Sequence, residues 1–374
     1  MIYFDSAATT LQKPPAVARA AAWAIGHMAS IGRGGHAPAM RAADTAFACR
    51  EAAARLFHVE DPEQVVLTFN ATHGLNIAIK SLVKAGDTVV ISGYEHNAVS
   101  RPLAALEGVT VKVATSPLFC PETAFKAFEE AMTQEVSCVV CNHVSNVFGY
   151  IQPVEAIAAL CRTRGIPFIL DASQSAGCCP IDMTGLGAAF IAMPGHKGLY
   201  GPQGTGLLLC GGKTKPLLEG GTGSASALQQ MPDFLPDRLE AGTHNIPGVA
   251  GLLEGIRFVE ERGQEAILSH ERRLCAQAAR GLAAMDGVTV YTAPGQTGVL
   301  SFTVAGIDCE EIGEFLGSAG IAVRAGLHCA PMAHRSAGTF QTGTVRVSFS
   351  VFNTEREVQS FLRVMRFILQ KIAT

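Results

Sequence analysis

The sequence predicts an α/β protein with a large, mostly parallel sheet, followed by a smaller α+β region. Between about residues 65 and 210, short and continuously apolar segments alternate with helix-like segments. Strands of this kind are buried on both faces, and the intervening helices imply parallel neighbours joined by right-handed crossovers. Apolar residues make up 48% of the 374 residues and charged residues 16%, which is enough for a large core. The expected strands are 64–69, 88–92, 109–114, 137–144, 167–172, 189–193 and 205–210.

Beyond this block the pattern changes. Residues 215–245 are rich in Gly, Pro, Ser and Thr and show little periodicity, which predicts an extended connection. The helices expected after it are 247–262, 266–285, 308–318 and 354–372, and the strands are 288–292, 298–304, 321–325 and 344–350. Because 374 residues favour more than one domain, we expect an N-terminal arm (1–12), a large domain (13–250) and a small C-terminal domain (251–374).

The charge balance and the ends of the chain exclude several classes of protein. Lys and Arg number 29 against 32 Asp and Glu, a net charge of -3, so neither a nucleic acid nor an anionic membrane is expected as partner. The sequence contains no uncharged apolar run of about 18 or more residues, so no membrane span is expected. The N-terminus, MIYFDSAATT, lacks the basic start and apolar stretch of a signal peptide. We expect a cytoplasmic protein.

Eleven cysteines invite a search for disulfides or metal sites, yet the pattern argues against both. Cys138 and Cys141 have CxxC spacing but lie in an expected strand, where residues three apart point to opposite faces. We therefore expect most cysteines to be small buried apolar residues, and no metal site. Cys329 differs because it lies in the loop-like segment RAGLHCAP.

A lysine in a glycine-rich loop gives the strongest chemical signal. Lys197 lies in PGHKGLYGPQGTG (194–206), directly after an expected strand, and Asp171 ends the strand before it, with Gln174 one short turn later. Ligands of open parallel sheets collect at the carboxyl ends of the strands. A lysine that holds an aldehyde and a carboxylate that keeps a pyridine nitrogen protonated are what pyridoxal phosphate requires.

A phosphate group needs donors of its own. The junction at 70–74 joins a strand to an amphipathic helix, where backbone N–H groups and the Thr72 hydroxyl are placed to bind a phosphate. Ordinary N-capping by Asn70 or Thr72 explains the same residues, so both interpretations stay open. His96, just after the strand 88–92, is placed to lie over a flat ring.

Nine segments in order along the whole chain resemble the fold-type I pyridoxal phosphate enzymes, specifically the class V aminotransferase-like cysteine desulfurases and selenocysteine lyases. They are YFDSAATT (3–10), NATHGLN (70–76), YEHNAVSRP (94–102), NHVSNVFG (142–149), DASQS (171–175), GHKGLYGPQGTG (195–206), LEAGTHN (239–245), RAGLHCAP (324–331) and TVRVSFSVFNT (344–354). The resemblance implies pyridoxal 5'-phosphate as cofactor, bound by the large domain, and a small domain that carries the loop of the catalytic cysteine.

The resemblance also implies roles for individual residues. The implied catalytic residues are Lys197, which carries the cofactor, Cys329, which accepts sulfur, and His96, which stacks on the cofactor ring. The implied cofactor contacts are Thr72, His73, His96, Asn146, Asp171, Gln174, His196, Lys197 and Thr243, the last reaching the phosphate of a neighbouring subunit. The implied substrate contacts are Asn146 and Arg346 at the carboxylate, together with Arg324. Arg324 and His328 also lie near Cys329 in sequence, where a positive charge would lower the pKa of its thiol. Pro194 and His73 depart from the pattern of the family and alter the phosphate contacts.

The function implied is that of a homodimeric cysteine desulfurase that converts L-cysteine to L-alanine and forms a persulfide on Cys329. The segment from Cys329 to Arg346 is compact, similar to the group of desulfurases that need a sulfur-acceptor protein. A selenocysteine lyase is the nearest alternative, because it uses nearly the same residues. A class V aminotransferase, another C–S lyase, and a non-catalytic scaffold that keeps the cofactor for stability stay open as further alternatives, since a fold does not fix a reaction.

Overall fold

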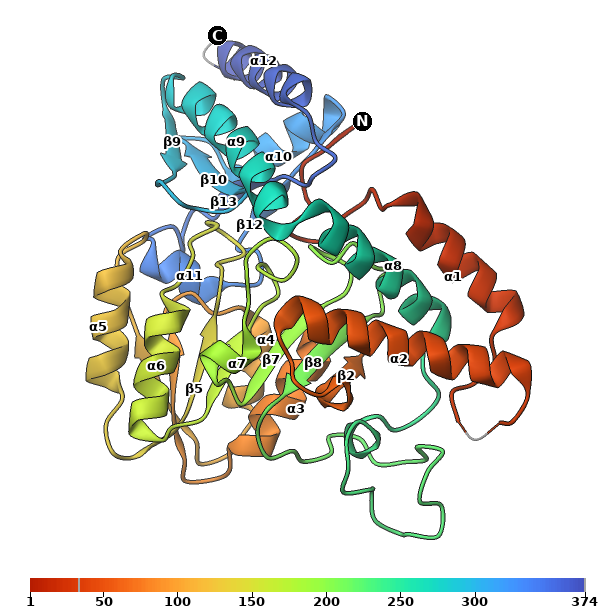
Figure 1. Cartoon of the computed structure of the whole chain (residues 1–374). Helices are drawn as coiled ribbons and strands as arrows, with labels where there is room; N and C mark the ends of the chain where they lie inside the picture. Colours follow the sequence, from red (N-terminus) through yellow and green to blue (C-terminus); the bar gives the residue numbers. More distant parts are fainter. Residues whose placement is uncertain (33, 373–374) are drawn as a thin grey trace.

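The main sheet of the computed structural model has seven strands, and it confirms the predicted mostly parallel α/β architecture (Figure 1). The structure describes residues 1–32 and 34–372. In spatial order the strands are β2 (Val65–Thr68), β8 (Gly206–Cys210), β7 (Phe190–Pro194), β6 (Phe168–Asp171), β5 (Val136–Asn142), β3 (Thr88–Ser92) and β4 (Thr110–Ala114). Only β8 runs antiparallel to its neighbours, because it follows β7 through the glycine-rich turn at 195–206.

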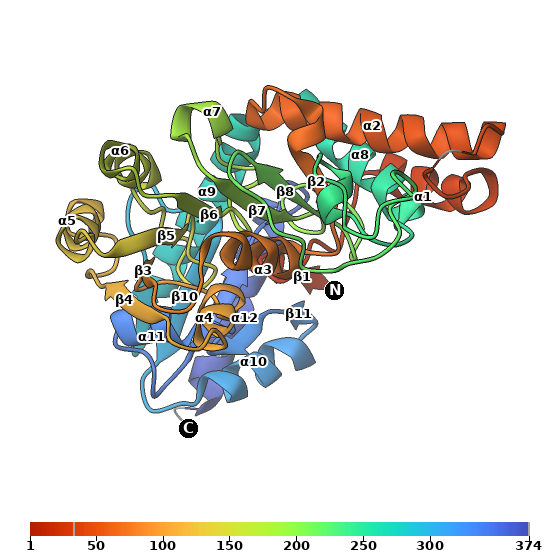
Figure 2. The same cartoon turned by 90° about the horizontal axis from the view of Figure 1, so that it is seen from below.

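Helices cover both faces of this sheet, as Figure 2 shows. The helices of this part are α1 (Pro15–His27), α2 (Ala37–Phe57), α3 (Ala71–Leu82), α4 (Asn97–Ala104), α5 (Pro121–Ala131), α6 (Val154–Arg164), α7 (Met183–Leu186) and α8 (Ile246–Arg262). On one face of the sheet, the strands form a hydrophobic core with α2, α5, α6 and α8. On the opposite face, they form a second hydrophobic core with α3 and α4. Cys141 packs in the first core and Cys138 in the second, so the two point to opposite faces, as their spacing on a strand predicts.

A four-stranded antiparallel sheet forms the second, smaller part. Its strands, in spatial order, are β12 (Arg324–Gly326), β13 (Thr344–Ser348), β10 (Val299–Val304) and β9 (Val288–Tyr291). Its core contains residues of α9 (Gln264–Ala283), α10 (Cys309–Ser318) and α12 (Glu355–Ile372). Helix α11 (Pro331–Ser336) instead packs against Tyr94, Val147 and Phe148 of the large part. The smaller part lies above the carboxyl-terminal side of the large sheet in Figure 1, so the chemistry-bearing loops of both parts meet between them.

Two features differ from the sequence-based expectation. The strand expected at 321–325 is split into β11 (Ile321–Ala322), which pairs with β1 (Ile2–Tyr3), and β12, which pairs with β13. The split arises because the N-terminal segment adds a parallel strand that only long-range contacts reveal. Helix α11 is also unexpected; it is a short turn of helix that begins at Pro331, a residue favoured at the first helical position.

The three-part domain division stays a proposal. Residue 251, the expected start of the small domain, lies inside α8, which packs against α1 and α2. Residues 211–245 are mostly irregular, as expected, with one short 3-10 helix at Asp237–Leu239. Among residues 1–32 and 34–372, no helix combines the length and the apolar character needed to cross a membrane.

Candidate active site

A cavity at the carboxyl ends of the parallel strands collects most of the residues that the sequence singles out. It is lined by Asn70, Ala71, Thr72, His96, Ala98, Asn142, Val144, Asn146, Asp171, Ser173, Gln174, Pro194, His196 and Lys197. These residues come from five strand ends and from the first turns of α3 and α4. The topology therefore brings together side chains that lie more than a hundred residues apart in sequence, as expected for an open α/β sheet.

Close backbone contacts of the neighbouring residues hold Lys197 in a half-buried position. A Cβ atom on Gly198 would lie 2.3 Å from the Ala176 carbonyl oxygen, and one on Gly177 would lie 2.0 Å from the Gly198 carbonyl oxygen. The two loops after β6 and β7 therefore touch through glycine backbone. Burial is the main cause that lowers the pKa of Lys197 to about 8, with Arg346 and Arg324 lowering it further and Asp171 opposing them. A lysine of this kind is a better nucleophile at neutral pH than an ordinary lysine.

Asp171 lies at the end of β6 and is 4% exposed. Its Oδ1 accepts hydrogen bonds from the backbone N–H of Ser173, at 2.9 Å, and from the Ser173 hydroxyl. These bonds fix the carboxylate at the floor of the cavity, next to the strand that leads to Lys197. Ser173 is a residue that sequence reasoning missed, although a serine two residues after an aspartate is a recognisable turn signal.

His96 caps α4, and its position defines its tautomer. Its Nδ1 accepts the N–H of Ala98 at 3.0 Å, so the proton of the neutral ring lies on Nε2. Burial is the main cause that lowers the pKa of His96 to about 4, while Asp171 opposes the shift. The ring is therefore uncharged at neutral pH, which suits an aromatic ring that stacks on a flat ligand.

The start of α3 and the residue before Lys197 form the side of the cavity at which a phosphate group is expected. The Asn70 side chain caps α3 by accepting the backbone N–H of His73 at 2.9 Å, so the capping interpretation holds for Asn70. The His73 ring turns to Phe69, stacking at 4.7 Å, and its Nε2 is buried without a partner among the described residues. His196 lines the cavity and contacts the Thr9 hydroxyl at 3.0 Å, and burial lowers its pKa to about 4.

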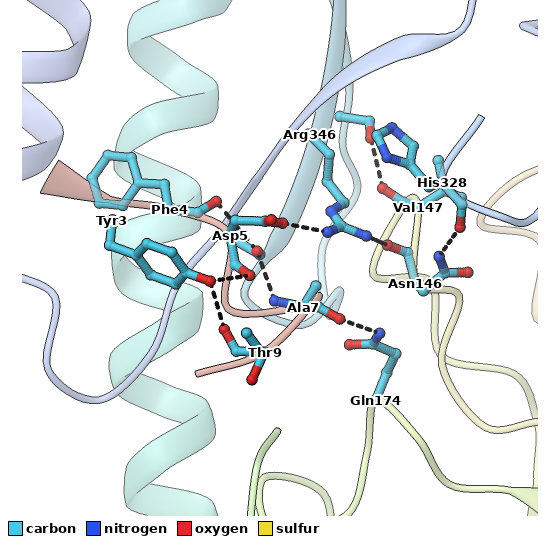
Figure 3. A network of polar contacts seen from close by, with 12 residues as sticks. Tyr3, Phe4, Asp5, Ala7, Thr9, Asn146, Val147, Gln174, His328 and Arg346 are labelled. Atoms are coloured by element: carbon cyan, nitrogen blue, oxygen red, sulfur yellow. Dashed lines mark hydrogen bonds and ion pairs between the residues drawn. The ribbon is translucent and has the colours of Figure 1, made fainter. Parts of the chain in front are cut away.

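Arg346, Asn146 and His328 lie close together beside the cavity, as Figure 3 shows. Arg346 is 2% exposed and donates from Nη1 to the Asn146 carbonyl oxygen at 3.0 Å. The Asn146 amide in turn donates to the His328 carbonyl oxygen at 2.8 Å. Arg324 lies opposite Arg346 on the neighbouring strand and is exposed. The two arginines that the sequence analysis expects near the substrate thus lie side by side on neighbouring strands of the small sheet.

Cys329 differs from the other cysteines. Of the eleven, all of which belong to the described part of the chain, Cys329 alone is exposed. Its carbonyl oxygen accepts the N–H of Asn97 at 2.8 Å, which ties its loop to the start of α4 beside His96. His328 and Cys329 both have positive φ angles, 50° and 55°, a conformation that costs energy for residues other than glycine. The loop is held in this conformation by Asn97 on one side and, through the His328 carbonyl oxygen, by the cavity residue Asn146 on the other.

One expectation about this region, a positive charge on His328 beside Cys329, differs from the structure. His328 contacts Thr344, and burial, with the charge of Arg346, holds the pKa of His328 well below its ordinary value. His328 is therefore neutral near pH 7 and supplies no positive charge to Cys329. Thr243 lies outside the cavity that contains Lys197. It lines a separate cavity with Arg50, Glu240 and His244.

Lys13 is a residue of this region that the sequence analysis missed. Burial lowers its pKa to about 8, and its ammonium group donates to the His196 carbonyl oxygen. No feature of the sequence around Lys13 distinguishes it from the other lysines.

The fold and this site define a class of protein, the class V aminotransferase-like enzymes. A sequence profile of the family described as Aminotransferase class-V matches residues 2–361. The chain belongs to this family, whose members use pyridoxal phosphate.

Several similar proteins are named probable cysteine desulfurases. The chain is 35% identical over 389 residues to a probable cysteine desulfurase of Mycolicibacterium paratuberculosis, covering 99% of this chain but 56% of that protein. It is 32% identical over 371 residues to one of Methanothermobacter thermautotrophicus, covering 96% of this chain and 92% of that protein. The chain thus spans little more than half of the first relative and nearly all of the second.

Solved structures agree in fold. The apo structure of the cysteine desulfurase from Thermococcus onnurineus NA1 has a TM-score of 0.88 and 31% identity, covering 99% of this chain and 95% of that chain. The cysteine desulfurase CsdA (S-sulfonic acid) from Escherichia coli has a TM-score of 0.85 and 27% identity, covering 98% and 94%.

Proposed function

We propose that this chain is a pyridoxal phosphate-dependent cysteine desulfurase that forms a persulfide on Cys329. The observation that carries the proposal is the place of Cys329, an exposed thiol on a strained loop. One side of the loop is bonded to Asn97, next to His96, and the other is bonded through the His328 carbonyl oxygen to Asn146. His96 and Asn146 both line the cavity that contains Lys197. The thiol is thereby tied to the rim of a cavity suited to an amino acid.

The residues of the cavity fit pyridoxal phosphate. When bound, this cofactor supplies an aldehyde that condenses with amines and a ring that withdraws electrons from the substrate. Lys197, with its lowered pKa, would hold the aldehyde, and the buried Asp171 would keep a proton on the pyridine nitrogen. The neutral His96 would cover the ring, and Gln174 would lie at its edge. Thr72 and His196 would donate to the phosphate.

The substrate contacts follow from the charges. Arg346 and Asn146, with Arg324 nearby, would bind the carboxylate of an amino acid, since a fixed guanidinium suits this planar anion. In the reaction, the Cys329 thiolate attacks the sulfur of L-cysteine. The S–S bond forms as the Cβ–S bond breaks, and the Cβ carbon gains a proton. One sulfur atom moves to Cys329, and L-alanine leaves.

Two variants test this function, because the loss of Lys197 and the loss of Cys329 should have different effects on activity. Lys197→Ala should abolish every cofactor-dependent reaction, and in the parent protein borohydride should attach the cofactor to Lys197. Cys329→Ala should still bind the cofactor and the amino acid but release no sulfide from L-cysteine. Cys120→Ala is the matched control, because Cys120 is the other cysteine that is not buried. Normal sulfide release by Cys329→Ala would refute the thiolate step, and activity on L-selenocysteine alone would favour the lyase.

We also propose a homodimer, a sulfur-acceptor protein and a cytoplasmic location. The support for shared active sites is that Thr243 lies outside the cavity of its own chain. If Thr243 contacts the phosphate, as the resemblance implies, it would therefore reach the phosphate site of a partner subunit. The support for an acceptor protein is the short segment from Cys329 to Arg346, in which α11 and the start of β13 follow Cys329 directly along the chain.

A further inference from the structure

The motif YFDSAATT at the N-terminus lies across the candidate active site, although the function proposed above gives it no role. In Figure 3 its backbone passes between Arg346 and Gln174. The Asp5 Oδ1 accepts a hydrogen bond from Arg346 Nη2 at 2.6 Å, and the pair is an ion pair. Two residues later, the Ala7 carbonyl oxygen accepts the Gln174 amide at 3.0 Å. The segment therefore contacts both Arg346, proposed above to bind the substrate carboxylate, and Gln174, proposed above to lie beside the cofactor ring.

The backbone around Asp5 is anchored on two sides. The N–H of Phe4 donates to the Ala322 carbonyl oxygen at 2.8 Å, and the Phe4 carbonyl oxygen accepts the N–H of Ser348 at 2.8 Å. The Phe4 ring is 0% exposed in the core of the small part. Asp5 itself forms a parallel bridge with Ser348. The fold thus fixes the position of the Asp5 backbone, so its carboxylate stays beside the Arg346 guanidinium.

Arg346 needs such a partner. Its side chain is 2% exposed, against 20% for Asp5, and Arg324 stands directly opposite it on the neighbouring strand. Two like charges opposite each other on adjacent strands are destabilising, and a buried cation is costly without an anion. Of the five guanidinium N–H groups, one bonds Asp5 and one bonds Asn146. Nε is buried without a partner among the described residues, so donors remain for a further anion.

We propose that Asp5 is a positioning residue for Arg346. It fixes the guanidinium in the orientation in which the remaining N–H groups bind the carboxylate of the amino-acid substrate. The inference deepens the proposed function and rests on it, because it takes Arg346 as the carboxylate-binding residue. It assigns to the N-terminal motif a role in substrate affinity and none in the chemistry at the sulfur atom.

The test compares two ligands that differ only in the carboxylate. The holoenzyme is titrated with L-alanine and with ethylamine, and binding is followed by the visible spectrum of the cofactor. Asp5→Ala should weaken L-alanine binding about 10- to 100-fold, the range of one charge-assisted hydrogen bond, and leave ethylamine binding unchanged. Asp5→Asn keeps an acceptor oxygen and should restore most of the affinity. With L-cysteine, Asp5→Ala should raise KM and leave kcat nearly unchanged.

Tyr3→Phe is the matched control. The Tyr3 hydroxyl donates to the carbonyl oxygens of Asp5 and Thr9, so its loss loosens the same segment without touching the ion pair. This variant should keep the preference for L-alanine over ethylamine. Equal weakening of both ligands by Tyr3→Phe and Asp5→Ala would mean that only the order of the segment matters, and would overturn the proposal. Tighter binding of L-alanine by Asp5→Ala would also overturn it, because Asp5 would then compete with the substrate.

A third variant separates this proposal from the proposed function. Arg346→Lys retains a buried charge and loses the planar fork. If it lowers the preference for L-alanine and Asp5→Ala does not, the role of Asp5 is wrong and the role of Arg346 stands. If Arg346→Lys leaves the preference unchanged, Arg346 does not bind the carboxylate, and the substrate assignment fails together with the role of Asp5.

Discussion

The proposed capture of the cofactor by Lys197 depends on the lowered pKa of this lysine, which can be measured directly. Burial lowers this pKa from 10.5 to about 8. At pH 7, about one in ten Lys197 side chains is then neutral, against about one in three thousand for an ordinary lysine. The neutral amine, which is the nucleophile, is therefore about 300-fold more abundant. This enrichment corresponds to about 3 kcal/mol of preference for the neutral form.

Competitive labelling of the cofactor-free protein with trace acetic anhydride measures this pKa without interference from the ionisation of the cofactor. Peptide mapping should show that labelling of Lys197 rises about tenfold per pH unit below pH 8 and levels off above it. Exposed Lys84, mapped in the same digest, reports the reagent and the pH. Asp171 raises the pKa of Lys197, so Asp171→Asn should move the inflection to lower pH. Labelling of Lys197 that rises in parallel with Lys84 beyond about pH 9.5 would refute the reasoning.

Three further predictions concern assembly and packing. Thr243→Ala should weaken cofactor retention by about 1.5–3 kcal/mol. If Thr243 acts across subunits, mixing Thr243→Ala chains with Lys197→Ala chains should partly restore activity in the heterodimers. If mixing restores no activity, Thr243 acts within its own chain. Glu240→Ala leaves Arg50, side chain 7% exposed, without its ion-pair partner, and should lower the free energy of unfolding by about 3–5 kcal/mol in urea denaturation. Gly177 has a φ of 95°, and a Cβ atom at this position would lie 2.0 Å from the Gly198 carbonyl oxygen. Gly177→Ala should therefore lower both Tm and cofactor retention, and an unchanged Tm would contradict the close packing.

Much of the fold was predictable because its signals are local. Strands β3, β5, β7 and β8 are continuously apolar and end at turn residues, and each was found within about two residues of its expected place. The positions of Asp171 and Lys197 at successive strand ends follow from the same pattern, since parallel strands carry their carboxyl ends to one edge. Cys329 was distinguished by a loop-like sequence around it, and it is the exposed cysteine of the chain.

Other features of the site could not be read from the sequence, because they depend on contacts between distant segments. Asp5 and Arg346 lie 341 residues apart, and nothing near Asp5 indicates that the N-terminal segment enters the small sheet. The neutral state of His328 is equally invisible, because it results from burial against Thr344 and Arg346.

The sequence by itself determined which elements form and which side chains end them, since hydrophobic periodicity and turn residues act over a few positions. The tertiary structure decided which of those ends share one cavity, how far each titratable group is buried, and which charge faces which. Burial and charge pairing set the pKa of Lys197, the tautomer of His96 and the orientation of Arg346. These properties arise from the exclusion of water and from the long-range placement of charges, and no local stretch of sequence encodes either.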